Sequence, residues 1–408
     1  MNTLKINQIL KDTAYVRMGG RKEELTCAKY LQKCCEDAGL KANIEPFEVD
    51  LADIHEVKLI VDGKEIECEG YMCSGNGEVE APIYYLRNTD SYSLKKCKGK
   101  IVLVDGFMRY WMYHDILDNG AVGFITYEGN ANYVDEDIMQ RELRPYISEG
   151  KLIPGVSIHA KTAIELVKND AKTAKIILSQ TQYKGASHNV IVDLPGEIDE
   201  YIVFTAHYDS TTCSVGAYDN MSGSIGVLEV AEYYAAHPHR YGLCFIWCGS
   251  EERGLLGAKA YCAMHEDELD KIVLNINVDM IGCIMGKFIA CCTAEERLVH
   301  YIEYLAQESG FGVKSYSGVY ASDSTPFADK GVPAVSFARI APDNTATIHN
   351  RYDTMKVLKA DQLKEDAEFI IRFSERMVHA KNCPVKREIP EDIKEKLDIY
   401  MFRKRETC

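Results

Sequence analysis

The sequence predicts an α/β protein whose main domain is a mostly parallel mixed sheet sandwiched by helices, with a smaller α/β domain inserted. Two observations lead to this prediction. From about residue 186 onward, continuous apolar strands alternate with helices, the order typical of a parallel sheet covered on both faces. Between about 55 and 183, short β-branched runs alternate with turn residues, which indicates a second sheet. The 408 residues suffice for two or three domains.

The N-terminal and inserted segments carry clear local signals. Leu25, Ala28, Leu31 and Cys35 recur at spacings of three and four, which predicts a helix over residues 22–38. In the inserted segment, strands are expected at 100–104 and 122–126, with a helix near 111–119 between them. We expect these pieces to form a small sheet with its own helices.

The second half of the chain alternates strands and helices in a regular order. The apolar runs predict strands at 189–194, 201–206, 243–248, 272–278 and 334–338. Helices are expected at about 222–236, 254–264, 294–309 and 360–380. The tail after Pro384 is rich in charge, and we expect it to pack loosely.

Composition excludes several function classes. Lys and Arg total 47 against 62 Asp and Glu, a net charge of −15, which argues against nucleic acid and anionic membrane as partners. No run of about 18 apolar residues is present, so no spanning helix is expected. The first twelve residues lack a signal-peptide pattern, and the 15 cysteines then fit reduced thiols in a cytoplasmic protein.

Histidines and carboxylates follow several of the predicted strands. They are His207 and Asp209 after 201–206, Asp219 at a helix start, Glu251 and Glu252 after 243–248, Asp279 after 272–278, and His349 after 334–338. In open α/β sheets, ligands bind beyond the carboxyl ends of the strands. These residues, far apart in sequence, are therefore expected to meet in one crevice.

Each of these residues taken singly has an ordinary explanation. Asp219 fits a helix N-cap, and Glu251 and Glu252 complement a helix dipole. Asp279 is harder to explain, because a carboxylate that ends an apolar strand is costly to bury unless it is paired or metal-bound. A mixed set of histidines and carboxylates suits Zn²⁺. The six groups other than Asp209 are too many for one tetrahedral site, but they fit two metals that share a bridging carboxylate.

These motifs resemble the co-catalytic two-zinc aminopeptidase family, whose relatives include glutamate carboxypeptidase II, the transferrin receptor ectodomain and glutaminyl cyclase. The likeness lies in Thr205–Ser210, Asp219–Gly223, the pair Glu251-Glu252, Asp279 and His349, over roughly residues 186–380. Residues 55–183 resemble the protease-associated (PA) domain inserted in many members, through 99–104 and 119–123. The resemblance implies a zinc-peptidase phosphorylase/hydrolase-like fold.

The resemblance also implies a role for each residue. His207 and Asp279 would bind one Zn²⁺, Glu252 and His349 would bind a second, and Asp219 would bridge both. Glu251 would be the general base for a zinc-bound hydroxide that attacks the scissile carbonyl, and Asp209 would orient His207. The expected activity is that of a metal-dependent exopeptidase acting on the N-terminal peptide bond of peptides.

Three alternatives stay open at this point: a carboxypeptidase, a glutaminyl-cyclase-like acyl transferase, and a non-catalytic peptide-binding module. A free substrate carboxylate would need a cation, and Arg339 and Arg351 follow site elements in sequence. Ser324 replaces a histidine that many relatives carry after Asp323. Tyr316 and Tyr320 are candidates to donate to the oxyanion. Self-association into a homo-oligomer is also left open.

The expected domain organisation follows from these assignments. Residues 1–54 would open the peptidase domain, 55–183 would form the inserted PA domain, 184–381 would complete the peptidase domain, and 382–408 would be the charged tail.

Overall fold

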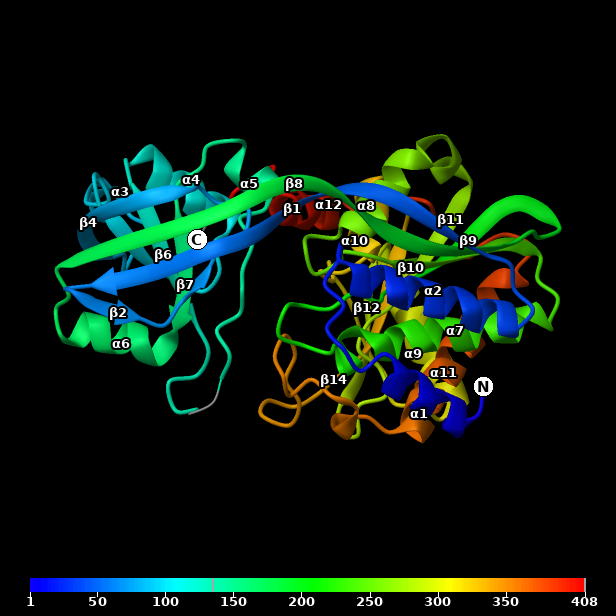
Figure 1. Ribbon diagram of the computed structural model, residues 1–408. Helices are drawn as coiled ribbons and strands as arrows, with labels where there is room; N and C mark the ends of the chain where they lie inside the picture. Colours follow the sequence, from blue (N-terminus) through cyan, green and yellow to red (C-terminus); the bar gives the residue numbers. More distant parts are fainter. Residues whose placement is uncertain (134–135, 407–408) are drawn as a thin grey trace. The chain divides into compact units, whose positions relative to one another are not determined.

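The computed structural model describes residues 1–133 and 136–406. The chain divides into two compact units, one made of Met1–Glu48 and Ala186–Cys408 and the other of Val49–Gly185. Two long strands, β1 (Ala42–Val61) and β8 (Thr173–Leu194), run through the boundaries between these units (Figure 1). In the described part of the chain, no helix is both long and apolar enough to cross a bilayer.

The first unit is built on a mixed sheet whose centre is parallel. Its strands, in spatial order, are β13 (Lys314–Ser317), β12 (Lys287–Thr293), β14 (Ala334–Ile340), β11 (Ile272–Val278), β9 (Ile198–His207), β10 (Tyr241–Cys248) and the last part of β8. Strands β14, β11, β9 and β10 are parallel to one another, whereas β12 and β8 flank them in antiparallel pairs. The predicted mostly parallel mixed sheet is confirmed.

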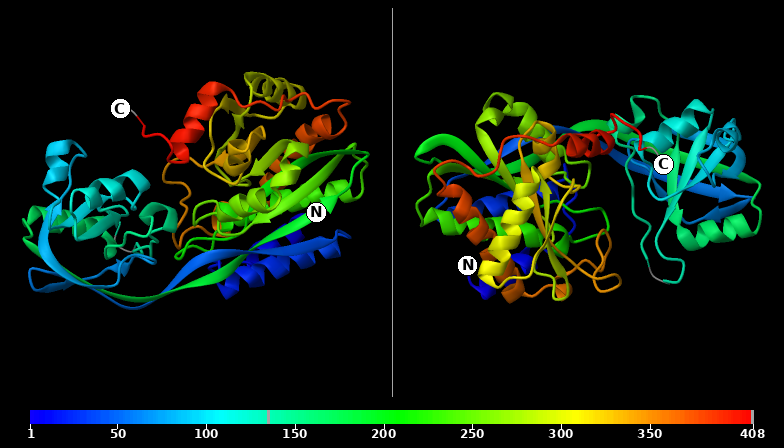
Figure 2. Two further views of the ribbon diagram at one scale, coloured as in Figure 1. Left: turned by 90° about the horizontal axis from the view of Figure 1, so that it is seen from above. Right: turned by 180° about the vertical axis from the view of Figure 1, so that it is seen from behind.

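Helices cover both faces of this sheet (Figures 1 and 2). One core is shared by α1 (Thr3–Asp12), α2 (Lys22–Asp37), α7 (Ser222–Ala235), α9 (Glu296–Ser309) and α11 (Ala360–Val378). The opposite core takes in α8 (Leu256–Met264) and Phe327 of α10 (Ser324–Asp329). Along β9, Ile202 and Phe204 enter the first core and Val203 the second, as the two-residue period of a strand requires. Three short helical turns complete the unit: η1 (Ala217–Met221), η2 (Glu266–Lys271) and η3 (Met355–Val357).

The second unit has a smaller sheet of its own. Its order is β8, β4 (Gly77–Tyr85), β5 (Ile101–Asp105), β6 (Gly123–Glu128), β7 (Gly155–His159) and β3 (Glu69–Gly70), while β1 pairs with β2 (Lys64–Ile66) and β8. Its helices are α3 (Ser91–Lys95), α4 (Tyr110–Asp118), α5 (Pro145–Ser148) and α6 (Ala160–Lys168). Side chains of α3, α4 and α5 share one core and those of α6 another, so this unit also buries two faces. The segment expected as the insertion, 55–183, lies within it.

The C-terminal tail does not pack loosely, and that expectation was wrong. Residues Glu391–Tyr400 form a helix, α12, and Ile389, Ile393 and Leu397 are buried with Ala328 and Ala334. Ile393 and Leu397, four residues apart, lie on one side of α12, and Ile389 stands just before the helix. That stripe is enough to dock a segment whose other residues are mostly charged.

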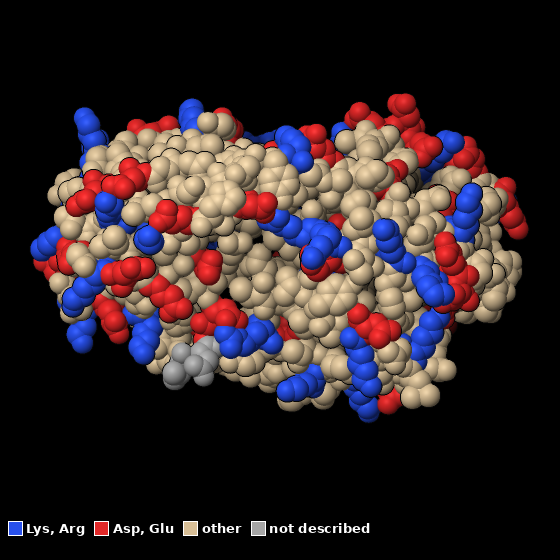
Figure 3. All heavy atoms as spheres, in the orientation of Figure 1, with Lys and Arg blue, Asp and Glu red and all other residues tan. Residues whose placement is uncertain are grey.

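The surface mixes both signs of charge. On the face shown in Figure 3, Lys and Arg side chains lie among Asp and Glu side chains over the described residues. The 14 cysteines that the structure describes are all free thiols.

Candidate metal centre

The seven residues singled out from the sequence lie at the carboxyl edge of the main sheet. His207 is the last residue of β9 and Asp279 directly follows β11. Glu251 and Glu252 stand in the turn after β10, Asp219 lies in η1, and His349 lies in the loop after β14. Because β10, β9, β11 and β14 are parallel neighbours, their carboxyl ends converge at one place.

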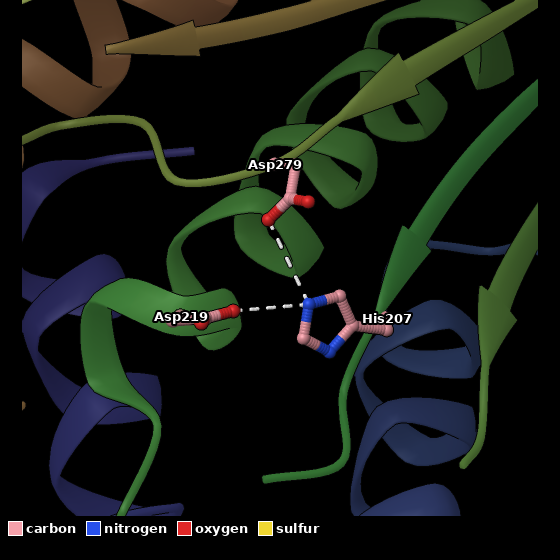
Figure 4. A group of neighbouring side chains, drawn as sticks. All are labelled: His207, Asp219 and Asp279. Atoms are coloured by element: carbon pink, nitrogen blue, oxygen red, sulfur yellow. Dashed lines mark ion pairs between the residues drawn. The ribbon is translucent and has the colours of Figure 1, made fainter. Parts of the chain in front are cut away.

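Three of these residues form a first candidate metal-binding group. His207 Nε2 lies 3.1 Å from Asp219 Oδ1 and 3.6 Å from Asp279 Oδ1 (Figure 4). Tetrahedral Zn²⁺ with bonds of about 2.0–2.1 Å separates its ligand atoms by about 3.3 Å. The three side chains are buried, and one ligand atom from each lies within 4.8 Å of the others. This arrangement fits a zinc ion.

A second group shares Asp219 with the first. His349 Nε2 lies 3.0 Å from Asp219 Oδ2 and 3.2 Å from Glu252 Oε2. The two oxygens of Asp219 therefore point to different histidines, one to His207 and the other to His349. A carboxylate in that position can bridge two ions, as in two-metal hydrolase sites.

The hydrogen bonding within the first group also fits a cation. Asp279 Oδ1 and His207 Nδ1 are buried and have no hydrogen-bond partner among the described residues. A buried carboxylate oxygen without a partner carries a large desolvation cost. A metal ion coordinated by Asp279 would remove that cost, whereas the protein alone does not.

The charges of the cluster shift the pKa values of both histidines. Burial by itself lowers the pKa of His207, but Glu251, Asp209, Asp219 and Asp279 outweigh it and raise the pKa well above its ordinary value. Burial also lowers the pKa of His349, but the charges of Glu252 and Asp219 outweigh this effect and raise the pKa to about 11. Without a metal, the surrounding carboxylates therefore favour the doubly protonated, charged form of both imidazoles.

Glu251 stands apart from the two metal-binding groups. Its Oε2 lies 3.9 Å from His207 Nε2, too far for a hydrogen bond, and neither group includes it. Burial is the main cause that raises the pKa of Glu251 well above its ordinary value. A carboxyl beside a metal site whose pKa is raised above its ordinary value is suited to general acid–base catalysis.

Asp209 supports the pair of glutamates through their backbone. Its Oδ1 accepts the amide N–H of Glu251 at 2.9 Å, and its Oδ2 accepts that of Glu252 at 3.3 Å. The distance from Asp209 Oδ1 to His207 Nδ1 is 3.5 Å, longer than an ordinary hydrogen bond. Orientation of His207 by Asp209 stays a prediction, while its contact with the glutamate turn was not anticipated.

Asn220 has a role that the sequence did not reveal. Its Nδ2 donates to Val278 O at 3.0 Å, and its Oδ1 accepts the Met280 N–H at 2.9 Å, so its amide group holds both neighbours of Asp279. Asn220 follows Asp219 through a cis peptide bond. One short segment therefore supplies the bridging carboxylate and fixes the backbone around the next ligand.

The segment with the unusual serine faces the interior. Ser324 is buried, and its Oγ lies 2.8 Å from Ser336 Oγ on β14. Its neighbour Asp323 is also buried, and burial raises the pKa of that carboxyl to about 7. Burial first, and then the charges of Asp279 and Asp219, raise the pKa of Tyr320 well above 10, which keeps a protonated phenol beside the site. Tyr316 instead has its side chain against Cys291.

Arg339 is engaged away from the metal-binding groups. Its guanidinium binds both oxygens of Asp366, with Nη2 at 2.6 Å from Oδ1, and donates to Gly286 O at 3.0 Å. It also lies over the rings of Phe288 and Phe311. Such a fully used guanidinium holds α11 against the sheet and has little capacity left for a substrate carboxylate.

Comparisons with known proteins agree with this geometry. Residues 189–374 match the model of Peptidase family M28. The chain is 26% identical over 375 residues to Aminopeptidase YwaD of Bacillus subtilis, covering 86% of this chain and 78% of that protein. It is 34% identical over 187 residues to Leupeptin-inactivating enzyme 1 of Streptomyces exfoliatus, covering 42% and 41% of the two chains.

Solved structures share the fold over nearly the whole chain. The aminopeptidase from Aneurinibacillus sp. strain AM-1 superposes with a TM-score of 0.77 at 23% identity, covering 94% of this chain and 96% of that one. BSAP, a zinc aminopeptidase from Bacillus subtilis, gives a TM-score of 0.77 at 24% identity, with 96% and 97% covered. Both units of the chain therefore have counterparts in solved structures.

Proposed function

We propose that this chain is a zinc-dependent aminopeptidase that hydrolyses the N-terminal peptide bond of peptides, since residues 189–374 match the model of Peptidase family M28. The observation that carries the proposal is the position of Asp219, whose two oxygens lie 3.1 and 3.0 Å from His207 and His349. That geometry supports two ions per chain rather than one.

The residues present fit zinc as the resident metal. His207 and Asp279 would hold one ion, Glu252 and His349 the other, and Asp219 both. Two zinc ions bound there would lower the pKa of a water molecule and polarise the scissile carbonyl. Glu251 would accept a proton from the attacking water and deliver it to the leaving amine, since its Oε2 lies 3.9 Å from His207 Nε2 and it belongs to neither metal-binding group.

The charges around the site support action at the amino end of a peptide. Asp219, Glu251, Glu252 and Asp279 give a cluster of acids that would attract a protonated or metal-bound amine. Recognition of a free carboxylate would need a cation, but Arg339 is already paired with Asp366 and Arg351 also has an interaction partner in the protein. We therefore place aminopeptidase activity ahead of carboxypeptidase activity.

The test uses four matched dipeptides that differ only at their ends: free, amino-acetylated, carboxyl-amidated and doubly blocked. We expect cleavage of the two substrates with a free amine, loss of cleavage after chelation, and recovery when zinc or cobalt is added. Metal analysis should give two ions per chain.

Other outcomes would overturn the proposal. Cleavage that requires a free carboxyl end would indicate a carboxypeptidase. Cyclisation of an amino-terminal glutamine with a single zinc would indicate a glutaminyl-cyclase-like acyl transferase. Binding of peptides without any turnover, with metal present, would indicate a peptide-binding module.

We also propose that residues 55–183 form a PA-type insertion and that the enzyme works in a reducing, cytoplasmic compartment on peptides. The free thiols of all 14 described cysteines support a reducing compartment. The net charge of −15 supports peptides rather than nucleic acid or anionic membrane as partners.

A further inference from the structure

The loop that joins His207 to the bridging Asp219, residues 208–218, is held by two charged side chains from distant parts of the chain. Arg17 contacts it from the segment between α1 and α2. Asp353 contacts its end from the loop that carries His349. Arg17 lies outside residues 189–374, the range matched by the family model.

Arg17 binds the loop through backbone carbonyls. Its side chain is fully buried, and its Nε donates to Tyr208 O at 2.8 Å and its Nη2 to Gly216 O at 3.0 Å. Its Nη1 donates to Val215 O, and its backbone N–H donates to Ser210 Oγ at 2.9 Å. Both ends of the loop are therefore fixed to one guanidinium, whose planar group of donors sets their separation.

Asp353 binds the backbone of the bridging ligand itself. Its Oδ1 accepts the N–H of Tyr218 at 2.7 Å, and its Oδ2 accepts the N–H of Asp219 at 3.1 Å. Two bonds from one carboxylate to consecutive amides fix the orientation of the peptide that leads into Asp219. Asp353 is four residues beyond His349, so both lie in the same loop. That loop therefore carries a ligand of the second ion, His349, and also orients Asp219, the ligand that the two metal-binding groups share.

Burial of the Asp353 carboxylate is unfavourable, and the two hydrogen bonds to amides do not by themselves explain it. Asp353 is fully buried close to the carboxylate of Asp219, where a second negative charge is unfavourable. A neutral oxygen acceptor would cap an amide without that repulsion. The charge of the Arg17 guanidinium offsets part of that repulsion, and cations bound by the cluster would offset more of it. A carboxylate at this place therefore fits a role in orienting Asp219 for metal binding.

We propose that Asp353 and Arg17 are positioning residues that set the bridging carboxylate of Asp219 before metal arrives, so that the two ions bind as a pair. The identity of the ions rests on the proposed function. Asp353 and Arg17 would hold Asp219 in place in the metal-free protein and would thereby raise the affinity of the site for zinc.

The main test is the zinc affinity of Asp353→Asn in the full chain, measured by competition with a chromophoric chelator, together with metal content per chain. Asparagine keeps the shape but turns an N–H₂ group toward one of the amides. Changes to groups that orient metal ligands cost about 10- to 100-fold in metal affinity. We expect a loss in that range, with both ions weakened together.

Asp62→Asn is the matched control. Asp62 lies in the other unit, and its carboxylate also accepts two consecutive amides, those of Lys172 at 3.0 Å and Thr173 at 2.9 Å. The same chemical change there should leave zinc affinity within about twofold. An equal loss in both variants, or an unchanged affinity in Asp353→Asn, would overturn the proposal.

A second measurement needs no variant of Asp353. Hydrogen exchange of the metal-free, unaltered chain should show slow exchange in peptides that cover Tyr218 and Asp219, and fast exchange there would overturn the proposal.

Arg17→Lys, which keeps the charge but loses the forked donors, should weaken zinc binding in the same direction. If the unaltered chain binds two zinc ions but cleaves no peptide, the proposed function fails while this inference stands.

Discussion

Replacing Glu251 by glutamine should separate catalysis from metal binding. The change keeps the size of the side chain, and its backbone bond to Asp209 comes from the amide N–H, which the substitution does not alter. No hydrogen bond to His207 is lost, since that distance is 3.9 Å. Both metal-binding groups therefore stay intact, and only the proton acceptor is removed.

The size of the effect follows from that role. A positioned general base contributes about 10²- to 10⁴-fold to rate, equivalent to about 2.7–5.4 kcal/mol of barrier at about 1.36 kcal/mol per tenfold. We expect kcat of Glu251→Gln to fall by that factor with two zinc ions retained and KM little changed. The assay is initial-rate hydrolysis of a dipeptide amide with a free amine, with metal content measured on the same samples.

The neighbouring Glu252→Gln provides the matched control. It makes the same chemical change one residue away, but at a side chain whose Oε2 lies 3.2 Å from His349 Nε2. We expect that variant to lose the second ion as well as activity. Loss of metal in Glu251→Gln, or kcat within about threefold of the unaltered chain, would refute the assignment of Glu251 as the base.

Three further outcomes are expected. In the chelated chain the pKa of His349 rises from 6.5 to about 11 on folding. The protonated histidine therefore stabilises the fold fully below about pH 6.5, and this contribution is lost as pH rises toward 11. Thermal melts should show Tm falling over about pH 6.5–9.5, and a rising Tm would contradict this. Arg339→Met leaves the buried Asp366 unpaired and should cost about 3–5 kcal/mol of unfolding free energy by urea titration, without any shift in the preference for free-amino over free-carboxyl substrates. Leu397→Ala removes a buried side chain of α12 and should lower the free energy of unfolding by about 2–5 kcal/mol. The exposed Lys396→Ala should change it by no more than about 0.5 kcal/mol. Equal effects of the two substitutions would mean that the tail is not docked.

Much of the fold follows from local pattern. The strand expected at 272–278 is β11 with the same bounds, and the helix expected at 222–236 is α7 over Ser222–Ala235. Strand β12 was not predicted, because a short apolar run such as 288–292 has no periodicity that distinguishes a buried strand from part of a helix. The docking of the tail was missed because Ile389, Ile393 and Leu397 stand in a segment dominated by charge.

The kinds of donor atoms and their places at strand ends could be predicted from the amino-acid sequence alone. Parallel strands bring their carboxyl ends to one edge, so the order of His207, Asp219, Glu252, Asp279 and His349 along the chain was sufficient to predict that they meet. The continuous apolar runs that alternate with helices indicated parallel strands, so no long-range contact had to be known.

The side chains that hold those donors in position are evident only in the folded chain. Arg17 reaches carbonyls about 190 residues away along the chain, and Asp353 reaches amides about 135 residues away. Arg339, near site elements in sequence, is paired with Asp366 instead. A side chain selects its partner by distance and burial in the folded chain, and neither quantity leaves a periodic trace in the sequence.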